Sequence, residues 1–377
     1  MSLDARYPAL SDLRARAKRR LPHFVWEYLS SATGNEAALH TMRAAYDRIG
    51  LVPRVLKGDI TPDLSVPAFG TPLPFGIAPV GMSGLIWPGA ERHLARSAAR
   101  AGIPYCLSTV AAAAPEDVAP DLGPHAWFQM YPPRDPQMRA DMLRRVQTAG
   151  FGTLVLTVDV PTPSRRERQT RSGLTSPPVF TPRVAWQVAR RPVWAWQTLR
   201  TGRPRMRTLD PYITKAQKGL PPNAHVGYLL RASPDWDYLR ALRAAWQGQF
   251  IVKGVLRPED AEQLEAEGVD AVWVSNHAGR QFEGAPAAID VLPAIRQATT
   301  LPLILDSGIE SGLDILRAVA MGADFVMMGR AWHYALAALG PTGPDHLVHI
   351  LTEDLKANMG QLAAATLRDL PAPVQLP

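Results

Sequence analysis

The sequence predicts an α/β protein built on a (β/α)8 TIM barrel, with an N-terminal helical extension and a long insertion after strand 4. Eight short segments rich in apolar residues alternate with helical patterns along residues 75–328. Parallel strands need helical crossovers of this kind, and eight such units close a barrel. A doubly wound sheet is the competing fold, but no Gly-x-Gly-x-x-Gly sequence follows the first strand.

Residues 10–32 form the first predicted element, a helical extension that precedes the barrel. Leu10, Leu13 and Ala17 recur at helical spacing. Pro22 follows them and marks either a break or the first turn of a new helix, because proline lacks the N–H group that a helix interior needs.

The eight strand candidates follow, mostly at intervals of roughly 18 to 30 residues. They lie at 75–80, 104–108, 126–131, 153–159, 250–253, 271–275, 302–306 and 324–328. Several of the intervening helical patterns end in glycine, the usual residue after a helix C-terminus. With a further helix at about 344–368, residues 1–377 are expected to form a single domain whose barrel spans about 75–340.

The regular spacing of the strand candidates is interrupted between strands 4 and 5, where about 90 residues intervene. We expect an inserted excursion at about 165–225. Its segment 181–209 has seven arginines, no acidic residue, and the tryptophans Trp186, Trp194 and Trp196. Tryptophan settles at the lipid headgroup level and arginine meets anionic lipid, so the segment predicts contact with a membrane surface. A mobile surface loop and a stretch packed on the barrel or on another subunit are the alternatives.

Composition limits the class of protein further. Of the 377 residues 46% are apolar, and the net charge of +7 favours anionic ligands or surfaces. Cys106 is the single cysteine, which excludes an intrachain disulfide and CxxC metal sites, and no metal is expected. No nucleic acid partner is expected, because no DNA- or RNA-binding motif accompanies the charge. The first 20 residues lack the apolar region of a signal peptide, so the expected location is cytoplasmic.

Polar residues follow the predicted strands at the end where barrels carry their chemistry. The loop at 275–281 contains His277, which can exchange a proton near neutral pH, and Arg280, whose guanidinium suits a carboxylate. Lys253 ends strand 5, where a buried ammonium needs an anionic partner. A capped turn, whose His and Arg bond only backbone carbonyls, is the alternative for the loop taken alone.

Glycine-rich turns follow the last two strands. Asp306-Ser307-Gly308 opens a helix, and Gly329-Arg330 follows strand 8. Turns at these two places form the usual phosphate site of a barrel, with backbone N–H groups and a helix N-terminus facing the anion. The sequence therefore predicts a ligand that carries phosphate.

From about residue 16 to residue 369 the chain resembles the FMN-dependent 2-hydroxy-acid oxidases and dehydrogenases, the group of glycolate oxidase, lactate dehydrogenase and mandelate dehydrogenase. The matching motifs are Ser-Asn-His-x-Gly-Arg-Gln at 275–281, Thr-Val-Asp-x-Pro and Arg-Arg-Glu within 157–167, Val-Lys-Gly at 252–254, Asp-Ser-Gly at 306–308 and Gly-Arg at 329–330. The resemblance implies oxidation of a small 2-hydroxy acid to a 2-oxo acid, FMN as cofactor, and a homotetramer.

The resemblance also implies a role for each site residue. His277 would be the base, and Asp159 would stabilise its cation. The substrate would be held by Tyr28, Tyr131, Arg166, His277 and Arg280, with Tyr131 at the reacting oxygen. The FMN contacts would be Pro79, Val80, Gly81, Ser108, Gln129, Thr157, Lys253, Ser275, Asp306, Gly308, Gly329 and Arg330, with Lys253 beside N1 of the flavin.

A membrane quinone is the favoured electron acceptor. Arg-Pro-x-Trp-x-Trp at 191–196 and Gly-Arg-Pro at 202–204 resemble elements of quinone-linked lactate and mandelate dehydrogenases, and Gly81 replaces the alanine of several oxidases. The protein would then lie on the inner face of the cell membrane. Three alternatives stay open: an oxidase that uses O2 and makes H2O2, another phosphate-binding barrel, and a non-catalytic protein built around the basic excursion. Gly81 and Val110 are small, which favours a substrate larger than glycolate.

Two residues depart from the pattern of the family. Glu310 stands where the family usually has arginine near the phosphate, so it either complements a helix N-terminus and faces solvent or weakens FMN retention. Ala278 replaces a usual glycine beside the base, a small steric change if the backbone there has negative φ.

Replacing Glu310 by arginine is expected to tighten FMN binding, because the change exchanges an acid near the expected phosphate for a base. Titration of the apoprotein with FMN, followed by flavin fluorescence, measures the dissociation constant. An unchanged constant would reject a position facing the phosphate.

Overall fold

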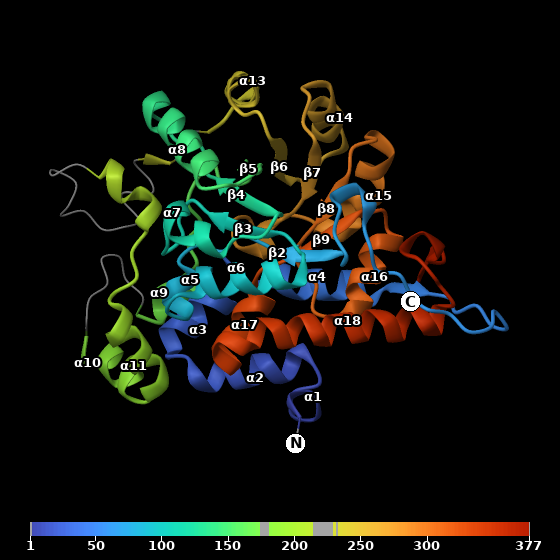
Figure 1. Ribbon diagram of the computed structural model, residues 1–377, viewed down its shortest axis with the longest axis horizontal. Helices are drawn as coiled ribbons and strands as arrows, with labels where there is room; N and C mark the ends of the chain where they lie inside the picture. The colour runs from blue at the N-terminus through green and yellow to red at the C-terminus, as the bar shows by residue number, and fades with distance from the viewer. Residues whose placement is uncertain (1, 174–180, 214–228, 231–232, 377) are drawn as a thin grey trace.

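The computed structural model describes residues 2–173, 181–213, 229–230 and 233–376 (Figure 1). Eight parallel strands close a barrel in chain order, which confirms the predicted fold class. The strands are β2 (Phe75–Ile77), β3 (Tyr105–Ser108), β4 (Ala126–Met130), β5 (Thr153–Thr157), β6 (Gln249–Val255), β7 (Ala271–Val274), β8 (Leu303–Leu305) and β9 (Phe325–Met328). β2 pairs with both β3 and β9, so the sheet closes on itself.

Helices cover the outside of the barrel (Figure 1). They are α6 (Ala90–Ala101), α7 (Pro115–Val118), α8 (Pro136–Thr148), α13 (Trp236–Ala245), α14 (Pro258–Ala266), α15 (Ala288–Ala298), α16 (Gly312–Ala320) and α17 (Arg330–Leu339). The short α5 (Ser83–Ile86) follows the loop after β2. The carboxyl ends of the strands thus open into loops on one rim of the barrel.

Side chains alternate along each strand between the inside of the barrel and the helix layer. The barrel is filled by Ala78, Cys106, Trp127, Val155, Ile251, Ala271, Trp273, Ile304, Phe325 and Met327. Phe69, which precedes β2, packs on Trp127 and Phe325 with ring centroids 6.0 and 5.0 Å away and covers the end where these strands begin. Because successive side chains point to opposite faces, the residue two positions after the last interior residue of each strand also points inward, at the other end of the barrel.

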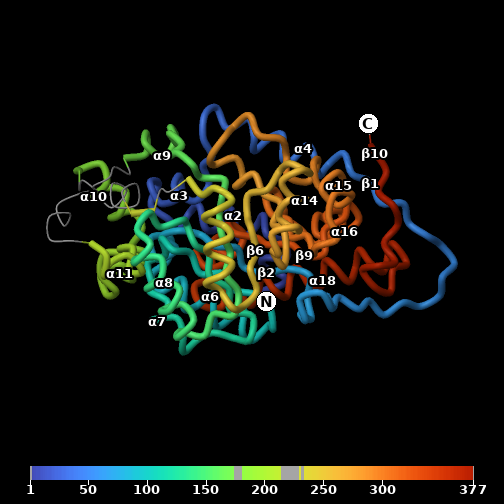
Figure 2. Tube along the Cα trace, turned by 90° about the horizontal axis from the view of Figure 1, so that it is seen from above, coloured from blue at the N-terminus to red at the C-terminus, as the bar shows by residue number. Residues whose placement is uncertain are grey.

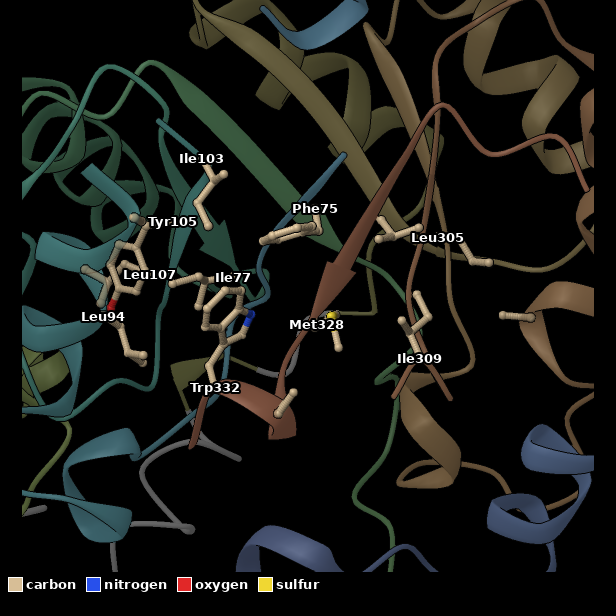
Figure 3. Packing of buried hydrophobic residues seen from close by; sticks show 14 of the residues in the cluster. Phe75, Ile77, Leu94, Ile103, Tyr105, Leu107, Leu305, Ile309, Met328 and Trp332 are labelled. Carbon is tan, nitrogen blue, oxygen red and sulfur yellow. The ribbon is translucent and has the colours of Figure 1, made fainter. Parts of the chain in front are cut away.

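A second apolar cluster joins the outer faces of the strands to the helices (Figure 3). Trp332 of α17 lies against Phe75, with ring centroids 6.1 Å apart, and its indole N–H donates to the Gly76 carbonyl at 3.2 Å. These contacts attach α17 to β2. The first turn of α17, which follows Gly329, is therefore held at the mouth of the barrel.

The N-terminal extension is two helices, with a break at Pro22. α2 (Leu10–Arg20) ends where Leu21 becomes extended, and α3 (His23–Ser30) begins after the proline. α2 packs along α17, and Leu13 is fully buried (Figure 1). The short α1 (Leu3–Arg6) precedes these helices, and α4 (Ala37–Asp47) follows them.

The C-terminal helix is shorter than predicted. α18 (Gly343–Leu362) stops before residue 368 because Ala363 adopts the left-handed conformation, with φ of 51°. The 3-10 turn Leu367–Asp369 follows it. β10 (Pro373–Gln375) then pairs antiparallel with β1 (Ile49–Leu51), at the opposite end of the molecule from the excursion (Figure 2).

The excursion contains α9 (Glu167–Arg171), α10 (Pro182–Ala189), α11 (Pro192–Thr201) and a 3-10 turn (Arg207–Tyr212). Its residues 174–180 and 214–228 lie outside the described part of the chain. Trp186 and Trp196 are 65% and 59% exposed, whereas Trp194 is 5% exposed. Trp194 therefore packs on the protein, and of these three tryptophans only Trp186 and Trp196 can meet a membrane surface. In the described part of the chain, no helix is long and apolar enough to span a bilayer.

Truncating Leu13 tests the packing of α2 on the barrel layer. Leu13→Ala is expected to lower the free energy of unfolding by about 2 to 5 kcal/mol, because it leaves a cavity in a closed core. Leu3→Ala is the control; Leu3 is exposed in α1 and should cost less than about 0.5 kcal/mol. Urea unfolding followed by circular dichroism measures both, and equal losses would contradict the packing described.

Candidate active site

A cavity of about 1240 Å³ opens at the carboxyl ends of the strands. All but three of the predicted site residues line it. Those that do are Tyr28, Pro79, Val80, Gly81, Gln129, Tyr131, Thr157, Arg166, Lys253, His277, Arg280, Asp306, Gly308, Gly329 and Arg330. The other three, Ser108, Asp159 and Ser275, lie behind this lining and contact residues in it. Residues from distant parts of the sequence thus meet at one rim.

His277 and Asp159 form a hydrogen-bonded pair at the edge of the cavity. His277 Nδ1 lies 3.0 and 3.1 Å from the two carboxylate oxygens of Asp159. A carboxylate only accepts hydrogen bonds, so Nδ1 carries the proton and Nε2 of the neutral ring keeps its lone pair. Burial opposes the charge of Asp159, but His277 and Lys253 outweigh it and lower the pKa of Asp159. Asp159 therefore stays anionic and can stabilise the imidazolium.

Gly254 makes this pair possible. It follows Lys253 at an irregularity of β6 and has a φ of +108°. A Cβ atom at this position would lie 2.6 Å from Cβ of Asp159. A larger residue here would push Asp159 away from His277, which explains the glycine of the Val-Lys-Gly motif.

Lys253 is held between two oxygen atoms. Its Nζ lies 2.8 Å from Oδ2 of Asp306 and donates to Oγ of Ser275 at 2.6 Å. Ser275 also accepts the backbone N–H of His277 at 3.1 Å. The hydroxyl of Ser275 thus orients the lysine and the loop of the base, and its predicted contact with FMN stays a prediction.

Ser108 also contacts a residue of the cavity lining. Its hydroxyl donates to Oε1 of Gln129 at 2.8 Å and so fixes the amide of Gln129, while its predicted contact with FMN stays a prediction. Nε2 of Gln129 and Oγ1 of Thr157 are buried and have no hydrogen-bond partner among the described residues. Buried polar atoms without partners are costly, so these two are suited to a polar ligand.

Arg280 and Arg166 make the cavity attractive to anions. Arg280 donates to the carbonyls of Tyr28 and Leu29 at 3.0 and 3.3 Å. Burial, followed by the charge of Arg166, lowers the pKa of Arg280 to about 9. Within the described residues, neither arginine pairs with a carboxylate. A bound carboxylate would relieve their repulsion, so the carbonyl contacts of Arg280 position an anion clamp.

Two tyrosines complete this part of the cavity. Burial and then Asp159 raise the pKa of Tyr131, so its phenol stays protonated and can donate a hydrogen bond. The hydroxyl of Tyr28 donates to the Gly81 carbonyl at 2.7 Å. The predicted bond from Tyr28 to a carboxylate would require this proton to turn away from Gly81.

Two residues at the loop after β8, one in the loop and one packed against it, have a part in the site that was not predicted. Ser307 has a φ of 78°, donates to Asp306 at 2.7 Å and accepts the N–H of Ala278 at 3.0 Å. Tyr46 donates to the Ser307 carbonyl at 3.2 Å. Ser307 could have been noticed between Asp306 and Gly308, but no local signal identifies Tyr46, which comes from α4.

Glu310 and Ala278, the two residues that depart from the family pattern, both lie at the cavity. Glu310 lines the rim of the cavity and pairs with Arg14 at 3.3 Å, both side chains being about half exposed. Ala278 has a φ of 52°, and His277 before it has a φ of 54°. The condition of a negative φ at Ala278 is therefore not met, so its methyl group strains the loop of the base.

Three comparisons with known proteins agree with one another. A profile of the FMN-dependent dehydrogenase family matches residues 17–375. An L-lactate dehydrogenase of Pectobacterium atrosepticum is 38% identical over 371 residues, which cover 96% of this chain and 95% of that protein. An L-lactate dehydrogenase of Alcaligenes faecalis is 37% identical over 371 residues, covering 96% of both chains. The crystal structure of the monotopic membrane protein (S)-mandelate dehydrogenase superposes with a TM-score of 0.91 at 31% identity, over 98% of this chain and 99% of that one.

Ala278→Gly is expected to raise the free energy of unfolding by roughly 0.5 to 1 kcal/mol, because glycine adopts a positive φ without strain. Ala241→Gly is the matched control: Ala241 is exposed inside α13, where the same change should destabilise by about as much. Chemical denaturation measures both variants. A loss of stability in Ala278→Gly would contradict the strained loop.

Proposed function

Because the chain belongs to the FMN-dependent dehydrogenase family, we propose that its cavity oxidises a 2-hydroxy acid to the 2-oxo acid with His277 as the base. The protein is an FMN-dependent oxidoreductase acting on 2-hydroxy acids. The observation that carries the assignment of roles is the placement of the His277–Asp159 pair, Arg280 and Lys253 on one cavity.

The residues present fit FMN. Nε2 of Gln129 and Oγ1 of Thr157, which are buried and lack a hydrogen-bond partner among the described residues, would bond the polar edge of the flavin. The ammonium of Lys253 would offset negative charge on the ring. The phosphate would meet Gly308, Gly329 and Arg330, where α17 begins. FMN supplies the acceptor for the two electrons of the reaction.

The substrate is oriented by its carboxylate. Arg280 and Arg166, which have no carboxylate partner in the described part of the chain, would bind that group in the cavity. Such a fixed anion turns the reaction into an effectively unimolecular step. Tyr131, whose phenol stays protonated, would donate to the substrate oxygen.

His277 moves the proton. Oxidation of a 2-hydroxy acid releases a proton from either the hydroxyl or Cα, and both atoms need a base beside them. Nε2 of His277 has the free lone pair for this proton, and Asp159 at 3.0 Å stabilises the cation that forms. Gly81 and Val110 are small residues of the cavity lining, and a Cβ at Gly81 would lie 2.7 Å from Val110 and displace it. We therefore propose a substrate with a side chain larger than that of glycolate.

Attachment to a membrane and a quinone acceptor belong to the same proposal. Trp186 and Trp196 are exposed on α10 and α11, beside the exposed Arg190 and Arg200, as in an interfacial anchor. The similar (S)-mandelate dehydrogenase is a monotopic membrane protein. Reoxidation by O2 is the alternative, and a homotetramer is proposed on the resemblance.

The proposed reaction is tested by mixing the FMN-loaded protein with 2-hydroxy acids in the absence of O2. The flavin absorbance should bleach, and a tailed quinone should restore it. If no acid in a panel from glycolate to mandelate bleaches the flavin, the proposed reaction is wrong. Fast production of H2O2 in air would instead assign O2 as the acceptor.

His277→Gln is expected to slow anaerobic bleaching by roughly 10² to 10⁴ fold, because it removes the base. Asp159→Asn should slow it as well, because the imidazolium loses its counter-ion. Both variants should keep their flavin spectrum. His349→Gln is the control, a half-exposed histidine on α18 that should bleach at the wild-type rate. Wild-type bleaching in His277→Gln would remove this residue from the mechanism.

A further inference from the structure

The cavity at the barrel mouth continues beyond the residues assigned to FMN and the acid. Its volume of about 1240 Å³ exceeds the roughly 300 to 1,000 Å³ of most small-molecule sites. The continuation, which we call the outer chamber, is bounded by α3, α9, α10 and α11. Its walls are Phe24, Gln169, Val184, Val188, Trp194, Thr198 and Leu199.

Most of the wall of the outer chamber is apolar and firmly packed. The rings of Trp194 and Phe24 meet edge to face, with centroids 5.9 Å apart. The indole N–H of Trp194 donates to the carbonyl of Leu85 at 3.2 Å, so only the carbon face of the ring is left for a ligand. Leu85 itself lines the same cavity, four residues after Gly81. The chamber is therefore continuous with the space beside the acid.

Two polar atoms interrupt this apolar wall. Oγ1 of Thr198 and Oε1 of Gln169 are buried and lack a hydrogen-bond partner in the described structure. Thr198 can donate a hydrogen bond to a carbonyl oxygen, and Oε1 of Gln169 can accept one from a hydroxyl. A quinone has a carbonyl that can accept from Thr198, and its quinol form has a hydroxyl that can donate to Oε1 of Gln169, so the reduced form would satisfy both atoms.

The outer chamber reaches the surface beside the exposed aromatic face of the excursion. Leu199 lines the cavity and yet is 75% exposed, so it marks the opening. Trp196 and Val193, on the same helix, are also exposed. An apolar opening among side chains suited to the lipid interface favours a ligand that arrives from the bilayer.

We infer that the outer chamber binds a lipid-soluble quinone, with its oxygens at Thr198 and Gln169 and its apolar tail leaving past Leu199. This inference rests on the proposed 2-hydroxy-acid dehydrogenase. The acid loses two electrons and two protons to become the 2-oxo acid, and the quinone gains two electrons and two protons to become the quinol. A long-chain 2-hydroxy acid is the competing occupant.

The test separates the two halves of the reaction in the FMN-loaded protein. Val188→Trp fills the chamber, and Thr198→Val removes the hydroxyl at nearly constant volume. Thr201→Val is the matched control, because Thr201 is exposed on the same helix and does not line the cavity. Flavin reduced with dithionite is mixed anaerobically with decylubiquinone or with a water-soluble dye, and its reoxidation is followed by absorbance.

Thr198→Val should raise the concentration of decylubiquinone that gives half the maximal rate of reoxidation by roughly 3- to 10-fold, the range for one net hydrogen bond. Val188→Trp should slow the reoxidation of the flavin by decylubiquinone roughly 10-fold or more. Reoxidation by the dye should be unaffected in this variant, and Thr201→Val should behave as the wild type with both acceptors. Unchanged quinone kinetics in both chamber variants would overturn the inference. Slower bleaching by 2-hydroxyoctanoate but not lactate, with quinone kinetics intact, would assign the chamber to the acid. Because dithionite, and not the acid, reduces the flavin, reoxidation by the quinone can be measured even if the protein does not oxidise 2-hydroxy acids.

Discussion

The alternation of side chains along eight closed parallel strands is the constraint on which the site depends. Each strand that places an apolar residue in the barrel places its next inward residue at the mouth. Cys106, Trp127, Val155, Ile251, Trp273 and Ile304 fill the interior, and the residues two positions later are Ser108, Gln129, Thr157, Lys253, Ser275 and Asp306. Packing of the core and assembly of the polar mouth are therefore one event, so a shift of register in any strand would remove its residue from the site.

Two of the charged groups at the mouth of the barrel each have a specific partner of opposite charge. Asp306 balances Lys253, and Asp159 balances the cation that His277 becomes, while Ser275 joins the two pairs through hydrogen bonds. The guanidinium groups beside them have no carboxylate of their own within the described chain. The protein thus holds a buried base ready and leaves positive charge for the anion that it binds, which is the electrostatic preorganisation that catalysis needs.

The periodicity and order of motifs were enough to predict the barrel, the break at Pro22 and most of the cavity lining. What the sequence could not supply were contacts set by register and by distant segments. Ser108 bonds Gln129 because β3 and β4 pair these two residues, and Tyr46 reaches the β8 loop from a helix 261 residues earlier. The left-handed backbone at Ala278 and the burial of Trp194 also depend on tertiary packing. Composition makes the three tryptophans of the excursion alike, but one faces the cavity and two face outward.

The central claim is that base, anion clamp and flavin address the same small acid. A crystal structure of the FMN-loaded protein with the 2-oxo acid bound measures this most directly. The account predicts the carboxylate of the acid on Arg280 and Arg166, its oxo oxygen within hydrogen-bond distance of His277 Nε2 and Tyr131, and the flavin edge at Lys253. An acid bound away from His277, or a flavin whose ring lies far from Lys253, would contradict the account.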